Sequence, residues 1–79
     1  MHLNIIFTET NIIVSKRRYD SWRDIQHDYA DYIASLGSWT QDEVADYLSS
    51  EYKNLSPSAD EQISTLITSL AETVVITFQ

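Results

Sequence analysis

The chain has 79 residues and a mass of 9.1 kDa, so we treat residues 1–79 as one small domain. Its 12 Asp and Glu residues outnumber its 5 Lys and Arg residues, for a net charge of −7. This excess disfavours nucleic acid or an anionic membrane as a direct partner, because both are negatively charged. The absence of cysteine excludes disulfides and thiolate metal sites.

The expected location is the cytoplasm. No segment approaches the roughly 20 consecutive apolar residues that a membrane span requires. The first residues also lack the basic stretch and the apolar stretch of a secretory signal peptide. The chain is therefore expected to remain in the compartment where it is made, with no membrane partner.

Three segments have the composition of β-strands. The runs at about residues 3–8 and 11–16 are rich in β-branched residues and are separated by a short polar break, which predicts a β-hairpin. A third run at about residues 73–78 alternates in the same way. A terminal strand needs a partner, so we expect it to join the hairpin in a three-stranded antiparallel sheet.

Three helices are predicted between these strands, at about residues 20–36, 40–54 and 57–71. In the first, apolar residues recur at spacings of three and four, and Gly37 follows as an expected C-terminal cap. The second opens with Thr40 and Glu43 in the spacing of a capping box. The third has Pro57 in its first turn. The apolar positions of the first helix are Trp22, Ile25, Tyr29, Ile33 and Leu36.

The resulting order, β-β-α-α-α-β, predicts a two-layer α+β fold with all three helices on one face of the sheet. Alternation along the strands then places Ile6, Ile13 and Val75 on the uncovered face. If these residues form a contiguous patch, they predict self-association as a homodimer. The alternative is a set of scattered apolar residues, which any protein surface carries.

Few residues could carry catalysis. His27 has Asp24 three positions before it and Asp31 four positions after it, which brings the three together on a helix surface. A metal site needs three or four ligands, however, and no second histidine-rich segment supplies them. No phosphate loop, nucleophile elbow or HExxH motif is present. We therefore expect no enzyme activity, no metal and no cofactor.

The basic run Lys16-Arg17-Arg18 could contact a phosphate. A run this short is more often a solvated strand end or a counter-charge for nearby carboxylates. With the chain so acidic, we interpret it in that way and expect no direct nucleic-acid binding.

The acidic residues are the most distinctive feature of the sequence. On the first predicted helix, four aspartates fall within an arc of about 80°, opposite the apolar stripe. Acids of the second helix would add to them if the two helices lie side by side. Tyr47 is a candidate interface anchor, with packing on Tyr32 or Trp39 as the alternative. The predicted partner-binding residues are Asp20, Asp24, Asp28, Asp31, Asp42, Glu43, Asp46 and Tyr47.

In size, lack of cysteine and negative charge, the chain resembles small phage-encoded decoys: anti-CRISPR proteins, anti-restriction proteins and uracil-glycosylase inhibitors. The resemblance is one of bulk properties and covers no alignable motif. It implies an inhibitor that mimics DNA and occupies a basic nucleic-acid-binding site on a partner protein. The alternative function is a structural or regulatory homo-oligomer whose acidic face only keeps it soluble. Salt dependence separates the two, because charge-driven binding weakens as ionic strength rises.

Overall fold

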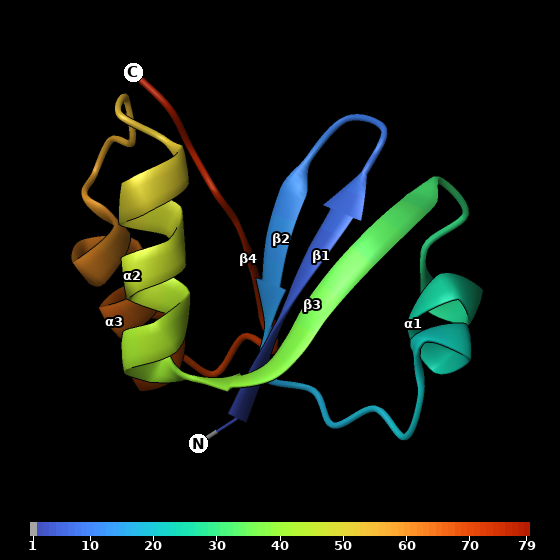
Figure 1. Ribbon diagram of the computed structural model, residues 1–79. Helices are drawn as coiled ribbons and strands as arrows, with labels where there is room; N and C mark the ends of the chain where they lie inside the picture. Colours follow the sequence, from blue (N-terminus) through green and yellow to red (C-terminus); the bar gives the residue numbers. More distant parts are fainter. Residues whose placement is uncertain (1) are drawn as a thin grey trace.

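The two N-terminal strands form the centre of the sheet. In the computed structural model, which describes residues 2–79, β1 (His2–Thr8) pairs antiparallel with β2 (Ile12–Ser15). β3 (Tyr32–Thr40) pairs antiparallel with the other edge of β1, and β4 (Thr73–Val75) pairs antiparallel with β2. The sheet order is therefore β3-β1-β2-β4 (Figure 1).

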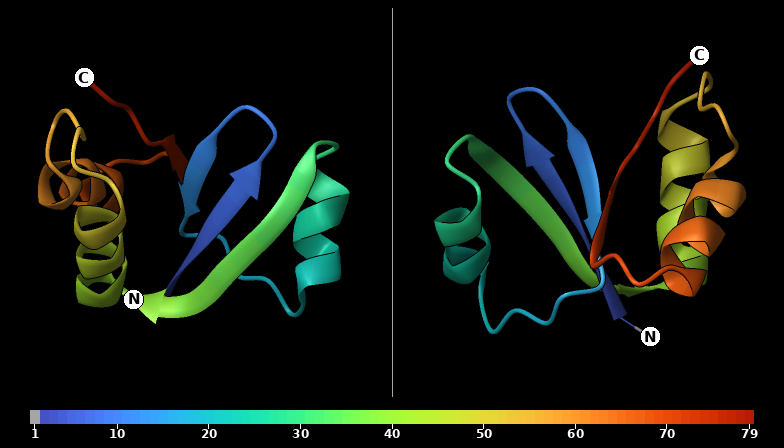
Figure 2. Two further views of the ribbon diagram at one scale, coloured as in Figure 1. Left: turned by 45° about the horizontal axis from the view of Figure 1, so that its top comes forward. Right: turned by 180° about the vertical axis from the view of Figure 1, so that it is seen from behind.

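The helices lie on both faces of the sheet. α2 (Gln41–Glu51) and α3 (Ala59–Thr68) cover one face, and α1 (Trp22–Asp28) lies against the other, as Figure 2 shows from two sides. The predictions of an α+β fold, an antiparallel sheet and three helices are confirmed. The predictions of three strands, of the order β-β-α-α-α-β and of helices on a single face are wrong. The observed order is β-β-α-β-α-α-β.

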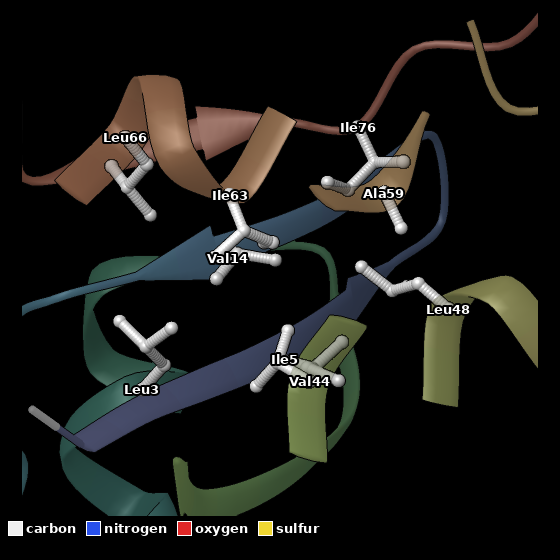
Figure 3. Close-up of a cluster of buried hydrophobic side chains, with 9 residues drawn as sticks. All are labelled: Leu3, Ile5, Val14, Val44, Leu48, Ala59, Ile63, Leu66 and Ile76. Atoms are coloured by element: carbon white, nitrogen blue, oxygen red, sulfur yellow. The ribbon is translucent and has the colours of Figure 1, made fainter. Parts of the chain in front are cut away.

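The larger core lies between the sheet and the α2–α3 layer, where inward side chains of β1 and β2 meet both helices (Figure 3). Its buried members are Leu3, Ile5, Val14, Val44, Leu48, Ala59, Ile63, Leu66 and Ile76. A smaller core on the opposite face joins Ile6, Ile13 and Ile25, with three tyrosines around them. Because β1 alternates between the two cores, both of its faces are buried.

The helix predicted over residues 20–36 is wrong: the segment contains α1, a turn and most of β3. Ile25 is buried as predicted, but Trp22 is 53% exposed and Ile33 is 62% exposed, so the predicted stripe does not form. The spacing of three and four between apolar residues continues past the end of α1, although the chain there is not helical. The segment after the turn is rich in β-formers and pairs with β1, which gives the outer edge of that strand its backbone hydrogen bonds.

Local signals predict the two longer helices, although Pro57 precedes the Ser58 N-cap of α3 and does not lie in the first helical turn as predicted. At the start of α2, the Thr40 hydroxyl accepts from the Glu43 N–H, and the Glu43 carboxylate accepts from the Thr40 N–H. This is the predicted capping box. At the start of α3, the Ser58 hydroxyl accepts from the Glu61 N–H. Both helices end a few residues earlier than predicted, at Glu51 and Thr68.

Gly37 lies within β3 and not at a helix C-terminus. Its φ is +132°, and the pairing of β1 with β3 shifts register between Leu3 and Ile5, opposite this glycine. A Cβ atom at position 37 would lie 2.7 Å from the Leu3 carbonyl oxygen and 2.7 Å from Asn4 Oδ1. The glycine therefore permits the close approach of the two strands.

We predict that Gly37→Ala lowers the free energy of unfolding by about 1–3 kcal/mol, because alanine strains this φ and its Cβ meets backbone. At an unstrained position the same change would instead stabilise by about 0.4–1 kcal/mol. Urea unfolding, with Ser38→Ala at an exposed position of the same strand as the control, measures the difference. Unchanged or increased stability in Gly37→Ala would contradict the close approach.

The Gln62 side chain holds the C-terminal segment against α3. Gln62 is 4% exposed. Its Nε2 donates to the Pro57 and Thr77 carbonyls at 2.7 and 3.1 Å, and its Oε1 accepts from the Thr77 N–H at 2.9 Å. One amide thus binds backbone groups of two segments that also pair with each other through the antiparallel bridge between Leu55 and Phe78.

We predict that Gln62→Ala destabilises the protein by about 1–3 kcal/mol, because the Pro57 carbonyl and the Thr77 N–H lose this partner. The Thr77 carbonyl keeps the Ser56 N–H as a donor. Thr65→Ala, an exposed change on the same helix, should cost less than about 1 kcal/mol. Thermal unfolding of both variants tests the comparison. Equal costs for the two substitutions would show that the amide is not a structural clamp.

Candidate functional site

The predicted acidic residues do not form one surface. Those near α1 and those on α2 lie on opposite faces of the sheet (Figure 1). Asp20 precedes α1 and Asp31 follows it, because the helix spans only Trp22–Asp28. The expected ladder of four aspartates along one helix is therefore absent from the structure of residues 2–79, and the acids of α2 cannot add to it.

Two of the aspartates near α1 bind other side chains of the same protein. Asp28 Oδ2 accepts from Arg17 Nη1 at 2.8 Å and from the Tyr19 hydroxyl at 3.0 Å. Asp31 Oδ2 accepts from the Thr10 hydroxyl at 3.3 Å. These contacts tie the segment before α1 and the β1–β2 turn to the α1 region, so both carboxylates have structural partners.

The α2–α3 layer carries the denser acidic surface. The two helices contain six acidic residues and no Lys, Arg or His. All six are exposed, and the single ion pair within residues 2–79 lies elsewhere, between Arg17 and Asp28. Serine and threonine hydroxyls occupy much of the remaining outer surface of both helices. The six residues are Asp42, Glu43, Asp46, Glu51, Asp60 and Glu61.

Glu43 differs from the other acids of this layer. The Thr40 backbone N–H that donates to its carboxylate stabilises the charged form and lowers the pKa of Glu43. Its side chain is thereby fixed at the N-terminus of α2. Among the acids predicted on this helix, Asp42 and Asp46 have the freer side chains on the surface turned away from the core.

Tyr47 packs on Trp39 with its ring edge-on, and the ring centroids are 5.4 Å apart. Packing on Trp39 is one of the two contacts predicted as alternatives to a role of Tyr47 as an interface anchor. Both rings are half-buried against the larger core, and burial raises the pKa of Tyr47. A role of Tyr47 as a partner anchor stays a prediction, and it would involve only the exposed part of the ring.

The residues predicted to mediate self-association do not share an open surface. Ile6 and Ile13 are 0% and 7% exposed because Ile25 of α1 packs on them. Val75, at the sheet edge, is 45% exposed. The premise of an uncovered sheet face is therefore wrong for two of the three residues, and dimerisation of the chain stays a prediction.

The basic segment after β2 has more defined roles than the sequence indicated. Lys16 Nζ donates to the carbonyls of Leu66 and Ser69, at 2.9 and 2.8 Å, and so caps the C-terminus of α3. Arg17 forms the ion pair with Asp28 and also lies 5.5 Å from the Tyr19 ring centroid. The ion pair confirms the predicted alternative of a counter-charge for a nearby carboxylate, and Arg17 and Arg18 are both exposed.

A cavity of about 540 Å³ opens beside this segment. Sequence reasoning missed it, because its walls come from three separate parts of the chain. The run of basic residues was the signal that could have drawn attention to it. Its lining residues are His2, Asn4, Lys16, Arg17, Arg18, Tyr19 and Ser38.

Tyr19 is the strongly perturbed titratable group in this region. Burial, followed by the hydrogen bond from its hydroxyl to the Asp28 carboxylate, raises the pKa of Tyr19 to about 12. The Tyr19 phenol is the donor in this hydrogen bond. This donor and the Arg17 guanidinium both bind Oδ2 of the Asp28 carboxylate.

Neither a metal site nor a membrane span is found in the described part of the chain. No three His, Asp or Glu side chains among residues 2–79 are grouped so that they could hold a metal ion. The candidate His27 is exposed on α1. None of the described helices is long and apolar enough to cross a bilayer.

The comparisons with known proteins show no family for this chain. No family model matches the sequence, and no curated protein or solved structure is significantly similar to it. The surfaces described above are therefore the basis for a functional proposal.

The raised pKa of Tyr19 predicts a pH dependence of stability. The folded state holds the phenolic proton more tightly than the unfolded state, so this contribution is present below about pH 10 and is lost between about pH 10 and 12. Tyr19→Phe cannot ionise, so the stability advantage of wild type over this variant should shrink across that window. Urea unfolding at a series of pH values measures it.

A direct control is the NMR titration of the Tyr19 ring. In Asp28→Asn the pKa of Tyr19 should fall, because the variant lacks the carboxylate charge. A Tyr19 that titrates with the ordinary value of 10.0 in wild type would contradict the proposed environment.

Proposed function

We propose that this protein is a small acidic binding module that engages a basic surface of another protein through its α2–α3 layer. The observation that supports this proposal is the charge composition of that layer. Six exposed carboxylates lie on two packed helices that contain no positive side chain. Interspersed lysines would serve solubility equally well, and α2 and α3 have none.

The specific form of the proposal is an inhibitor that occupies the nucleic-acid-binding site of its partner. Such a site is positive and normally holds phosphates, so a carboxylate-rich helical surface can compete for it. The resemblance in size and charge to anti-CRISPR and anti-restriction proteins favours this form. The binding residues in this proposal are those of the α2–α3 layer, whereas Asp28 and Asp31 have structural partners.

Two quadruple variants with the same change in net charge test which surface binds. The first, Asp42→Asn, Asp46→Asn, Asp60→Asn and Glu61→Gln, neutralises the α2–α3 layer and keeps the Glu43 cap. The second, Glu9→Gln, Asp20→Asn, Asp24→Asn and Glu72→Gln, neutralises exposed acids elsewhere. Each is immobilised beside wild type and exposed to an extract of the cells that make the protein, at low and at physiological salt.

We predict that the first variant loses the captured basic partner and that the second retains it. Affinity should fall by at least tenfold in the first variant, mainly through slower association. Salt should have a similar effect, because the screening length falls from about 30 Å at 0.01 M to about 8 Å at 0.15 M. Duplex DNA should displace the partner if its nucleic-acid site is the one occupied.

Equal capture by both variants would contradict the α2–α3 surface. Capture that resists DNA but depends on the α2–α3 acids would support a basic partner and contradict the inhibitor of a nucleic-acid site. If only copies of the chain itself are recovered, in a salt-independent way, the homo-oligomer is the better description. Sedimentation of the purified protein measures that state directly.

A further inference from the structure

The basic cavity exists because α1 is too short to cover its face of the sheet. Seven residues span about 10 Å along a helix axis, and α1 uses this length to cover Ile6 and Ile13. The start of β1 and the end of β3 extend beyond it and contribute Asn4 and Ser38 to the cavity. The segment that connects β2 to α1 closes the other side with Tyr19 and the basic residues.

The charge of this cavity is opposite to that of the whole chain. Three of the five Lys and Arg residues line it, and none of the twelve Asp and Glu residues does. A random surface of this protein would carry more acids than bases. The segregation of positive charge into a concave site is the property expected of a binding site for an anion.

The three cations differ in how far they are compensated. Arg17 is neutralised by its ion pair with Asp28. Lys16 donates to two carbonyls at the C-terminus of α3, which hold its position and partly offset its charge. Arg18 is exposed and makes no ion pair within residues 2–79. Among the described residues that line the cavity, Arg18 is therefore the one Lys or Arg whose charge has no ion-pair or hydrogen-bond partner, and the net charge of the lining stays positive.

We propose that this cavity binds a small molecule that carries a phosphate monoester. Such a group has a charge of about −1.5 to −2 at neutral pH, and the exposed Arg18 guanidinium is the cation of the lining that can pair with it. Arginine offers the planar pair of donors that suits phosphate oxygens, and Asn4 and Ser38 add neutral polar groups. The volume of about 540 Å³ lies within the roughly 300–1,000 Å³ typical of small-molecule sites. It leaves room for an organic group beside the phosphate.

This site is separate from the proposed partner-binding surface. The lining residues belong to β1, β3 and the segment before α1, and none belongs to the α2–α3 layer. The one link is Lys16, which also caps α3. The phosphate site can therefore be tested with the α2–α3 acids intact, and its failure would leave the proposed function unaffected.

The test uses the full chain and four defined probes: phenyl phosphate, inorganic phosphate, benzoate and a short DNA duplex. Isothermal titration gives the dissociation constants, and amide chemical shifts from NMR locate the contact. We predict saturable binding of phenyl phosphate, with inorganic phosphate weaker and benzoate weakest. The shifts should concentrate on Asn4, Arg18, Tyr19 and Ser38.

Arg18→Gln is the main variant, because Arg18 is exposed and its replacement should leave the fold intact. We predict a loss of at least tenfold in affinity for phenyl phosphate. Lys53→Gln removes the same charge outside the cavity and should change affinity less than twofold. Ser38→Leu, which fills the cavity without changing charge, should also abolish binding of phenyl phosphate.

Three results would overturn the proposal. The first is the absence of saturable phenyl phosphate binding up to roughly 10 mM, which corresponds to a very weak site. The second is an equal loss of affinity in Arg18→Gln and Lys53→Gln. The third is tighter binding of the DNA duplex than of phenyl phosphate. The last would identify the basic segment as a nucleic-acid contact. Unperturbed thermal unfolding of Arg18→Gln confirms that a loss of binding is not a loss of fold.

Discussion

Burial of the central hairpin on both faces is the constraint on which the rest of this structure depends. Consecutive residues of β1 point to opposite sides, so Ile5 packs against α2 and α3 while Ile6 packs against α1. A sheet with large aliphatic side chains on both faces must be covered twice. Two helices cover one face, and the seven-residue α1 covers the other. The larger core, the smaller core and the basic cavity all follow from this unequal covering of the two faces.

The parts of the fold that the sequence predicted correctly are those with local causes. The hairpin follows from alternation, and α2 follows from a capping box in which Thr40 and Glu43 satisfy each other's backbone groups. The helix prediction is wrong for the segment from Tyr29 to Trp39, because the helical spacing of its apolar residues conflicts with its β-forming composition. The outcome depended on the unpaired edge of β1, which no local pattern reveals.

The candidate surfaces could be predicted only in part for the same reason. Exposure of the acids was correctly expected from their chemistry, and all six acids of α2 and α3 are exposed. Which acids share a face depended on where β3 lies, because that strand carries the chain from one side of the sheet to the other (Figure 2). The basic cavity was beyond sequence reasoning: His2, Arg18 and Ser38 meet there through the register of β1 with β3 and the path of the connecting segment.

The irregular pairing of β3 also bears on how this protein avoids aggregation. β3 is an edge strand, and a long flat edge is a template on which other chains can add strands. Register shifts on both sides leave only three consecutive regular pairs with β1, those of Leu36, Ser35 and Ala34. The φ of +132° at Gly37 also interrupts the regular extended backbone along this edge. At the opposite edge, β4 is only three residues long, so neither border of the sheet offers an extended ladder to a second chain.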